Sequence, residues 1–213
     1  MGSVELTARL RRLGESVWWI EELDPELVAA AARQQDLFGP GVNELVPAYD
    51  VLAVYGELPR DWRVRLGKVV LTSEEPMCHR LPICYELNLD LEPVCSKLGV
   101  EAEQFISIHL EAEFVCMAMG FQPGFGYLGV LPATIAGVPR LSSPRSRLEP
   151  GSVGIQGDQT AVYPQASAGG WNIIGRCPVN FGNREDGFLL SVGDRVQFNR
   201  ITEAEFNRMV EAP

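Results

Sequence analysis

Residues 151–177 read GSVGIQGDQTAVYPQASAGGWNIIGRC, and this stretch indicates the architecture of the second half of the chain. Short runs rich in β-branched and aromatic residues (SVGIQ, TAVYP, WNIIGR) alternate with turns that contain glycine or proline, which is the pattern of short strands. The pattern begins at residue 113 and includes FVCMAM, FLLSV and RVQFNRI. We therefore expect an all-β barrel or sandwich, followed by a helical tail from about residue 203.

Two short helices are expected before this β-rich region. The first has apolar residues at helical spacing and ends at Gly99, and the second covers residues 101–110. Two helices joined by a glycine turn also occur in DNA-binding helix-turn-helix motifs. However, the second helix, EAEQFISIHL, contains Glu101 and Glu103 and no Lys or Arg, which is the wrong charge for a phosphate-lined groove.

The first 77 residues show a different pattern. VWWI at 17–20 resembles a strand, and Asp24 and Pro25 then supply an N-cap and a first-turn proline for a helix that ends before Gly39. Extended segments at 44–48 and 51–55 and a helical pattern over 62–70 follow, with 80–85 as a possible final strand. The order predicts a ferredoxin-like α+β domain over residues 1–77 and a second domain over 78–213, separated near TSEEPMCH.

Composition excludes several classes of partner and site. The net charge of −10 disfavours nucleic acid and anionic membranes, because both attract clustered Lys and Arg. Neither an apolar run of about 18 residues nor a signal peptide is present, so we expect a cytoplasmic protein. Five cysteines without a C-x-x-C pair, and only His79 and His109 as histidines, predict reduced thiols and no metal site.

GFGYLG at residues 124–129 matches the G-x-G-x-x-G fingerprint of dinucleotide-binding proteins. The fingerprint functions only where a helix follows the glycines and directs its N-terminal amides at the pyrophosphate. Here Pro132 and Pro139 interrupt the next segment, and the lysines that a kinase-type glycine loop would need, Lys68 and Lys97, both lie upstream. The motif alone does not predict nucleotide binding.

Several motifs, taken in order, resemble one known family. GFQPGFGYLG, then PRLSSPRSRLEPGSVGIQGDQTAVYPQASAGGWNIIGRCPV, then LLSVGDRVQF are similar to the KipI/PxpB family, and LGESVWWIEE, PGVNELVPAYDVLAVY and LPICY extend the match to nearly the whole chain. Members are called the B subunit of 5-oxoprolinase, allophanate hydrolase subunit 1 or inhibitor of a sporulation histidine kinase. The resemblance implies that the second domain is a cyclophilin-like β-barrel.

The resemblance also implies a function. The chain would be one component of a hydrolase that converts 5-oxoproline to glutamate with ATP and Mg²⁺, together with a KipA/PxpC-like subunit and a LamB/PxpA-like component. ATP would be bound at the level of the complex and not by this chain alone, which lacks a P-loop. Two alternatives stay open: a protein inhibitor of a sensor histidine kinase, and a subunit in allophanate or urea metabolism.

His109 matches the histidine of the family and is the candidate acid/base group. A position near a helix C-terminus favours the imidazolium and predicts a modestly raised pKa. The alternative is a histidine that only caps the helix or binds backbone. Around it the chain departs from the family pattern, with Leu110-Glu111-Ala112-Glu113-Phe114 after the histidine and Tyr85-Glu86-Leu87-Asn88-Leu89 where a glycine-rich segment is usual.

The candidate substrate-binding residues follow the glycine motif, and they are Arg145, Arg147, Gln159, Thr160, Tyr163, Trp171 and Arg176. Guanidinium groups suit carboxylate or phosphate oxygens, so these arginines, with Arg140, form a candidate anion site, although they could equally pair with surface carboxylates. The polar residues alternate along an expected strand, and Trp171 could line a pocket or only fill the barrel.

Three aromatic residues stand among the glycines of the motif, Phe121, Phe125 and Tyr127. They could pack on the core or on a partner chain, and we expect packing on the core because three exposed aromatic rings would form a costly patch. Cys116 lies in an expected strand without a basic neighbour, so no cysteine nucleophile is predicted.

Overall fold

The computed structural model describes residues 7–71 and 76–211. The chain separates into two compact units, Met1–Pro76 and Met77–Pro213. Most of the described residues outside loops lie in antiparallel strands, and helices are few and short.

The first unit contains an antiparallel sheet with the strand order β1-β2-β4-β3. β2 and β3 are joined through a helix, and β4 lies between them and pairs with both. The elements of this unit are β1 (Arg9–Arg12), β2 (Val17–Glu21), α1 (Pro25–Arg33), the 3-10 helix η1 (Gln35–Phe38), β3 (Val42–Ala48), β4 (Val51–Gly56) and α2 (Trp62–Leu66).

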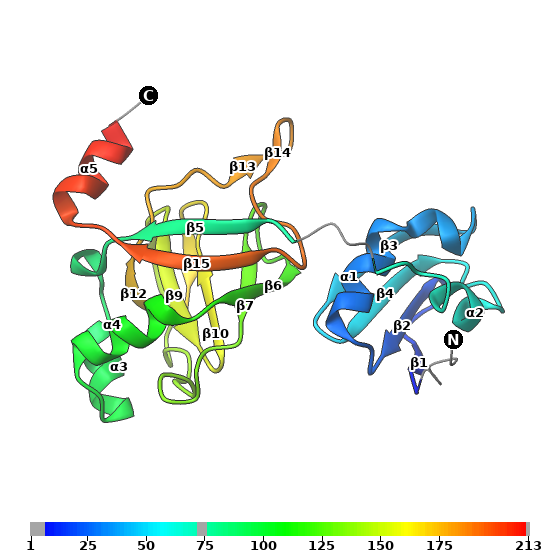
Figure 1. Cartoon of the computed structure of the whole chain (residues 1–213), viewed down its shortest axis with the longest axis horizontal. Coiled ribbons are helices and arrows are strands. Elements are labelled where there is room, and N and C mark those ends of the chain that lie inside the picture. The colour runs from blue at the N-terminus through cyan, green and yellow to red at the C-terminus, as the bar shows by residue number, and fades with distance from the viewer. Residues whose placement is uncertain (1–6, 72–75, 212–213) are drawn as a thin grey trace. The chain divides into compact units, whose positions relative to one another are not determined.

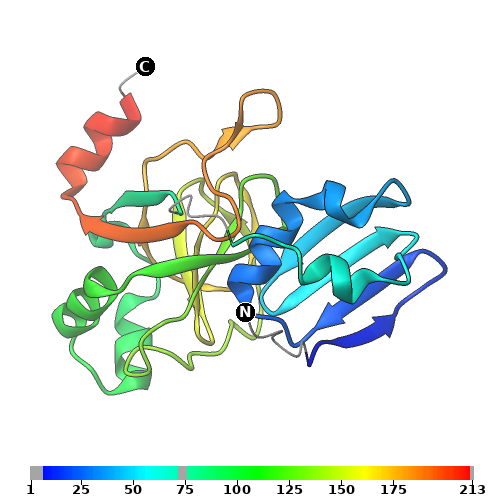
Figure 2. The same ribbon diagram turned by 45° about the vertical axis from the view of Figure 1, so that its right-hand side comes forward.

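Helices α1 and α2 pack against one face of this sheet (Figure 2). The Asp24 carboxylate accepts hydrogen bonds from the first two free amides of α1, at 2.8 and 3.3 Å, which confirms the predicted N-cap. The apolar side of α1 then packs on residues that alternate along the strands, such as Ile20 and Leu52. The core of this unit therefore lies between the helices and one sheet face.

Three details of this unit differ from the sequence-based expectation. β1 has no signal in the sequence, because all four of its residues are exposed and show no apolar alternation; instead Arg11 and Arg12 place their guanidiniums over the rings of Trp19 and Trp18. α2 ends at Leu66 with Gly67 as its C-cap, so it covers only part of the helical pattern over 62–70. The strand expected at 80–85 is β5 of the second unit.

The second unit is a sheet that closes on itself (Figure 1). β5 pairs in parallel with β15, β15 pairs with β6, and the order continues β6-β7-β10-β9-β12. An isolated bridge between Cys84 and Arg176, with N–O distances of 2.8 and 2.9 Å, joins the end of β12 to the residue after β5. This bridge completes the circuit of hydrogen-bonded strands.

The strands of the second unit are β5 (Cys78–Ile83), β6 (Phe114–Met119), β7 (Gly126–Gly129), β8 (Arg145–Leu148), β9 (Ser152–Gln156), β10 (Gln159–Val162), β11 (Ser167–Gly169), β12 (Asn172–Arg176), β13 (Gly182–Asn183), β14 (Gly187–Phe188) and β15 (Arg195–Arg200). Its helices are the 3-10 helix η2 (Tyr85–Leu87), α3 (Leu91–Leu98), α4 (Ala102–Glu111) and α5 (Glu203–Glu211). The two helices expected over 91–110 and the C-terminal helix are confirmed.

The strands divide their side chains between two apolar clusters. Thr160 and Val162 of β10 point into the closed sheet, where Val162 packs with Phe114 and Leu128 and with residues of α3 and α4. Ala161 and Tyr163 alternate with them and point outward into a second cluster. This outer cluster lies beneath the two-stranded ribbon of β8 and β11.

The glycine motif of residues 124–129 forms a β-hairpin and not a nucleotide-binding turn. Gly126–Gly129 are strand β7, antiparallel to β6. In the described part of the chain, the next helix after Gly129 is α5, which begins at Glu203. Of the expected strand FLLSV only Phe188 is extended, in β14.

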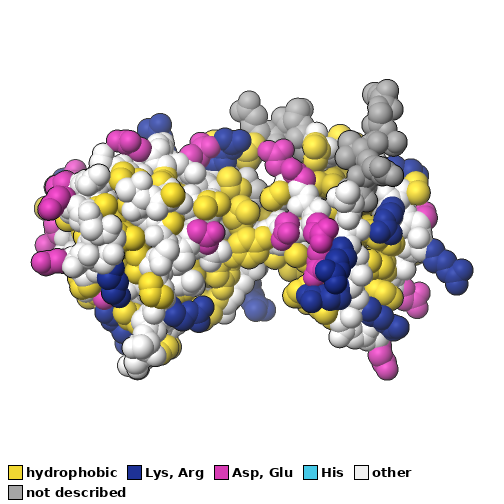
Figure 3. Space-filling model, turned by 90° about the horizontal axis from the view of Figure 1, so that it is seen from below, with side chains coloured by type: hydrophobic (Ala, Val, Ile, Leu, Met, Phe, Trp, Pro, Cys, Tyr) yellow, Lys and Arg dark blue, Asp and Glu magenta, His cyan; other side chains and the backbone are white. Residues whose placement is uncertain are grey.

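Acidic and basic side chains lie next to one another on the face of the molecule shown in Figure 3. Among the residues that the structure describes, no helix is long and apolar enough to cross a bilayer.

Candidate functional site

His109 lies in the last turn of α4 and is completely buried inside the closed sheet. Its Nδ1 is 2.8 Å from the hydroxyl of Tyr85, and its Nε2 is 3.4 Å from Oγ1 of Thr160. Thr160 donates its own proton to the carbonyl oxygen of Gly154, at 3.2 Å. Because that proton is committed, Nε2 carries the imidazole hydrogen and Nδ1 accepts from Tyr85.

Burial lowers the pKa of His109 to about 3, so the expectation of a raised pKa is wrong. The ring is enclosed by Phe105, Phe114 and Phe198, with centroids 4.9 to 6.2 Å away, and an imidazolium there would lose its hydration. The same burial raises the pKa of Tyr85. The structure therefore holds a neutral Tyr85–His109–Thr160 chain inside the barrel.

Tyr163 and Trp171 belong to the outer cluster, where Phe125 connects them. The centroid of Phe125 is 5.3 Å from that of Tyr163 and 5.9 Å from that of Trp171, both in edge-to-face geometry. Tyr127 is half-buried and lies 6.0 Å from Trp171. The expected packing on the core holds for Phe125 and Tyr127, whereas Phe121 contacts Phe125 and Tyr163 with one edge and is otherwise exposed.

Gly154 and Gly169 make room for this outer cluster. A Cβ on Gly154 would lie 3.0 Å from Cβ of Trp171, and one on Gly169 would lie 2.8 Å from the hydroxyl of Tyr163. At Gly169 the backbone therefore approaches the side chains of both Leu148 and Tyr163 closely. The glycine that follows, Gly170, has no such neighbour, since its nearest contact is Pro144 at 3.6 Å.

Arg145 is held beside this cluster by Asp90, which precedes α3. Nη1 and Nη2 of Arg145 donate to the two carboxylate oxygens at 3.0 and 2.6 Å, and the amide of Ile173 in β12 donates to the same carboxylate at 2.6 Å. No sequence signal marks Asp90 as a partner of Arg145, because an Asp at this position normally caps the helix. Here the Asn88 side chain accepts from the amide of Leu91 instead.

The other two predicted arginines have separate partners. Arg147 is exposed and pairs with Glu149 at 3.1 Å. Arg176 donates to the carbonyl of Pro150 at 2.8 Å and lies 5.0 Å from the ring of Phe206. Each guanidinium thus has its own contacts, and the arginines are not held together by a shared group.

The outward side of β9 and β10 carries further polar groups. Gln159 is half-buried and alternates with Ala161 and Tyr163, so it lies on the outer side, whereas Thr160 lies on the inner side. Arg140 donates to Gln156 of β9 at 3.5 Å. Burial raises the pKa of the Tyr163 phenol, and the charge of Arg140 acts on the same group in the opposite direction.

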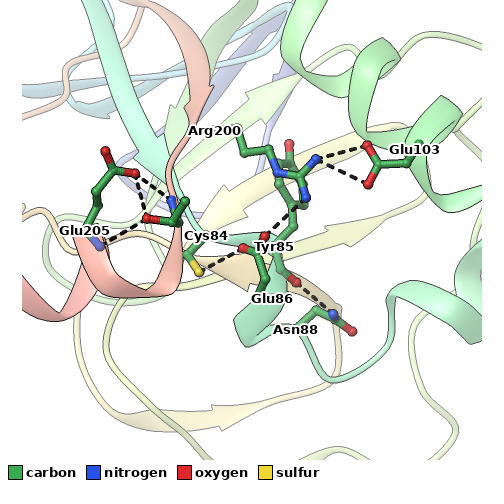
Figure 4. Close-up of polar contacts among 8 residues, drawn as sticks. Cys84, Tyr85, Glu86, Asn88, Glu103, Arg200 and Glu205 are labelled. Atoms are coloured by element: carbon green, nitrogen blue, oxygen red, sulfur yellow. Dashed lines mark hydrogen bonds and ion pairs between the residues drawn. The ribbon is translucent and has the colours of Figure 1, made fainter.

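A charged network without any signature in the sequence lies near Tyr85 (Figure 4). Arg200 of β15 donates to Glu103 of α4 at 2.9 and 3.2 Å and to Glu86 of η2 at 3.2 Å. The thiol of Cys84 donates to Glu86 at 3.2 Å. These contacts connect η2 and α4 to β15. η2 contains Tyr85 and α4 contains His109.

The geometry limits the chemistry of the described residues. Burial raises the pKa of Cys116 to about 12, so this thiol stays protonated at neutral pH. Within residues 7–71 and 76–211, no three His, Cys, Asp or Glu side chains are placed to hold a metal ion. Phe125, Tyr163 and Trp171 are buried in the outer cluster, whereas Tyr127 is half-buried at its edge. The groups that remain partly exposed there are this ring and the Arg145 guanidinium, a cation that suits a carboxylate.

Comparison with known proteins connects this geometry to a family. The family model for the carboxyltransferase domain, subdomain C and D, matches residues 9–189. The chain is 36% identical to the B subunit of 5-oxoprolinase from Bacillus subtilis (strain 168), over 96% of this chain and 94% of that protein. It is 34% identical to the B subunit of 5-oxoprolinase from Escherichia coli O157:H7, over 90% of this chain and 95% of that protein.

Solved structures of related proteins have a similar fold. The crystal structure of TTHA0988 has a TM-score of 0.71 at 32% identity and covers 91% of this chain, which spans 40% of the TTHA0988 chain. The Kluyveromyces lactis urea amidolyase shares the fold at 16% identity, with a TM-score of 0.68; the match covers 96% of this chain and 15% of the amidolyase. The chain therefore belongs to the family of 5-oxoprolinase B subunits (KipI/PxpB), within the carboxyltransferase domain, subdomain C and D.

Proposed function

We propose that the chain is one component of an ATP-dependent 5-oxoprolinase, which converts 5-oxoproline, ATP and water to glutamate, ADP and phosphate. The observation that supports this best is the 36% identity to the 5-oxoprolinase B subunit of Bacillus subtilis along nearly the full length of both chains. The KipA/PxpC-like subunit and the LamB/PxpA-like component are the partners in this proposal, and the complex is cytoplasmic.

The outer cluster is the proposed substrate surface. 5-Oxoproline is a five-membered lactam with one carboxylate, so its binding calls for a fixed cation beside an apolar surface. Arg145 fits the first requirement, because Asp90 occupies two of its five N–H groups and its side chain remains 30% exposed. Tyr127 fits the second, because its half-buried ring lies against the buried Trp171.

The remaining predicted residues have less direct roles in this proposal. Gln159 and Tyr163 lie on the same outer side as Trp171, whereas Thr160 and His109 contact each other inside the barrel. The catalytic role of His109 stays a prediction, as do substrate contacts by Thr160, Arg147 and Arg176. For His109 we favour a positioning role, because it contacts Thr160 of β10, the strand that also contains Gln159.

ATP does not fit a site built from the glycine motif of this chain. Gly126–Gly129 are paired in a strand, so their amides are used by the sheet and no helix N-terminus follows in the described residues. ATP and Mg²⁺ therefore belong to the assembled complex in this proposal. No step of the reaction is assigned to this chain beyond holding the substrate.

The proposal also includes the finer fold assignments. The placement of β4 between β2 and β3, which α1 joins, supports a ferredoxin-like first domain, with β1 as the remaining edge strand. The closed circuit of strands in the second unit supports a cyclophilin-like barrel.

The test is 5-oxoproline-dependent ATP hydrolysis by the co-expressed complex. We expect ADP release to require 5-oxoproline and both partners, and Arg145→Ala to raise KM for 5-oxoproline at least tenfold while Arg147→Ala leaves it within about twofold. Hydrolysis that responds to allophanate and not to 5-oxoproline would contradict the proposal. So would inhibition of histidine kinase autophosphorylation by the chain alone, combined with an inactive complex.

A further inference from the structure

The β6–β7 hairpin stands in the longest uncharged part of a strongly charged chain. Residues 115–139 contain no Asp, Glu, Lys, Arg or His, whereas 22% of the whole chain is charged, so a stretch of this length would carry about five charges on average. Most surfaces of soluble proteins are rich in charge, and depletion of charged residues marks the centre of protein–protein interfaces. The hairpin is therefore a candidate docking surface.

Phe121 stands at the tip of this hairpin and is 62% exposed, although Phe125 four residues later is 1% exposed. Its φ is +66°, a left-handed conformation that is unfavourable for an aromatic residue. The turn is held by hydrogen bonds from the amide of Gln122 to Gly120 and from the amide of Phe125 to Gln122, at 2.8 and 3.1 Å. One edge of the ring contacts Phe125 and Tyr163, with centroids 5.3 and 6.1 Å away, and most of the ring remains exposed. Backbone strain of this kind concentrates at functional sites.

The surroundings of Phe121 complete an apolar patch. Phe188 is 37% exposed and lies against Gly124, with its Cδ1 3.4 Å from where a Cβ would stand. Pro123 is also exposed. We call these three residues, Phe121, Pro123 and Phe188, the Phe121 patch. Charged side chains follow beyond it, at residues 184–186 between β13 and β14, as in the polar rim of an interface.

The charge of the chain and the length of one relative indicate what covers the patch. A second copy of this chain would bring another net charge of −10 to the contact, and the two copies would repel each other. In contrast, this chain spans only 40% of TTHA0988, so in that relative an equivalent of this chain is covalently joined to more protein. Both observations favour a different protein chain as the occupant.

We propose that the Phe121 patch is the surface on which the KipA-like subunit docks, with the ring of Phe121 entering an uncharged pocket of that subunit. The proposal rests on the function proposed above, because it takes its partner from there. It predicts that Phe121 contributes to binding the partner and not to the stability of this chain.

Binding is measured by isothermal titration calorimetry of the purified chain with the purified KipA-like subunit. An interfacial aromatic anchor contributes about 2 kcal/mol or more, so Phe121→Glu is expected to raise Kd at least 30-fold. The matched control is Val210→Glu, which adds the same charge at a residue of α5 with 58% exposure, and which should leave Kd within about threefold. Equal Kd values for the wild type and Phe121→Glu would overturn the proposal.

A second variant separates docking from folding. Phe121→Gly relieves the positive φ, so its Tm should equal or exceed that of the wild type, while its Kd rises about tenfold or more. A lower Tm with unchanged Kd would mean that the ring only packs on Phe125 and Tyr163, and the proposal would be wrong. Light scattering of the chain alone gives a further check, since a dimer that Phe121→Glu dissociates would assign the patch to self-association.

These readouts keep the two proposals apart. A complex that forms with Phe121-dependent Kd but shows no 5-oxoproline-dependent ATP hydrolysis contradicts the proposed function and supports the docking surface. A complex that hydrolyses ATP in response to 5-oxoproline and forms equally well with Phe121→Glu supports the function and contradicts the docking surface. Failure of the wild-type chain to bind the KipA-like subunit contradicts the docking proposal outright.

Discussion

The hydroxyl of Tyr85 donates to Nδ1 of His109 across 2.8 Å of barrel interior, and this bond fixes the imidazole in its Nε2–H form. The two residues come from η2 and α4, segments that the Arg200 network also ties to β15. Nε2 of the imidazole contacts Oγ1 of Thr160, and Thr160 donates a hydrogen bond to the carbonyl oxygen of Gly154 in β9. A single chain of polar groups therefore crosses the barrel from η2 to the strand that lies beneath Trp171.

Tyr85→Phe tests whether this chain stabilises the fold. The variant keeps the ring and removes only the donor, which leaves Nδ1 of His109 buried and unpaired, so the free energy of unfolding should fall by about 1–3 kcal/mol. Urea denaturation followed by circular dichroism measures it. Tyr55→Phe is the control, because Tyr55 is an exposed tyrosine of the first unit and its hydroxyl reaches water. An unchanged midpoint for Tyr85→Phe would show that the bond contributes nothing.

Acid should destabilise the protein through His109. The folded pKa of about 3 lies below the ordinary value of 6.5, so between these values the unfolded chain binds a proton that the folded chain does not. Stability is therefore fully present above pH 6.5 and is lost as the pH falls toward 3. From pH 6.5 to 5 the loss amounts to roughly 1.5 kcal/mol.

The measurement compares the unfolding free energy of the wild type and His109→Gln over this pH range. Glutamine does not titrate, so its profile should be flatter by the amount above, while contributions common to the two proteins cancel in the comparison. Parallel profiles for the two proteins would mean that His109 has the same pKa in the folded and the unfolded chain, which would contradict its burial among apolar side chains.

The sequence is sufficient for elements whose side-chain pattern reports their burial. β6, β9 and the helices α3 and α4 are predictable because their apolar residues alternate or recur on one face. β1 is not, since an exposed edge strand whose partners are tryptophans of β2 carries no such pattern. Periodicity reports which residues face a core and says little about strands that face water.

In the candidate site, too, the sequence alone does not determine which residues come together. Alternation predicts that Gln159 and Thr160 point to opposite sides, but which side is the interior depends on how the sheet closes, far along the chain. Asp90 and Arg145 are 55 residues apart, and no local signal links them. Phe121 and Phe125 are equivalent as letters, and only the turn geometry exposes one and buries the other.

Asp90→Asn tests the clamp on Arg145. The amide can accept from only one side, so one charge-assisted bond to the guanidinium is lost, and we expect about 1.5–3 kcal/mol less stability and a higher KM for 5-oxoproline. The control is Glu149→Gln, because the Arg147–Glu149 pair is exposed and its loss should change stability by no more than about 0.5 kcal/mol. If both variants behave alike, the Asp90–Arg145 contact is only another surface pair.

Gly169→Ala tests whether the outer cluster depends on close backbone approach. The new methyl would lie 2.5 Å from Cδ1 of Leu148, 2.8 Å from the hydroxyl of Tyr163 and 2.9 Å from its ring carbon. Leu148 and Tyr163, or the β8–β11 ribbon, must therefore move, at a cost of about 1–3 kcal/mol. Movement of Tyr163 disturbs Phe125 and Trp171, so tryptophan fluorescence should shift and KM for 5-oxoproline should rise. Gly170→Ala, whose methyl meets Pro144 at an ordinary 3.6 Å, should leave both unchanged. Equal effects at the two glycines would show that any side chain disturbs this turn and that contact with Tyr163 is not the reason for glycine at residue 169.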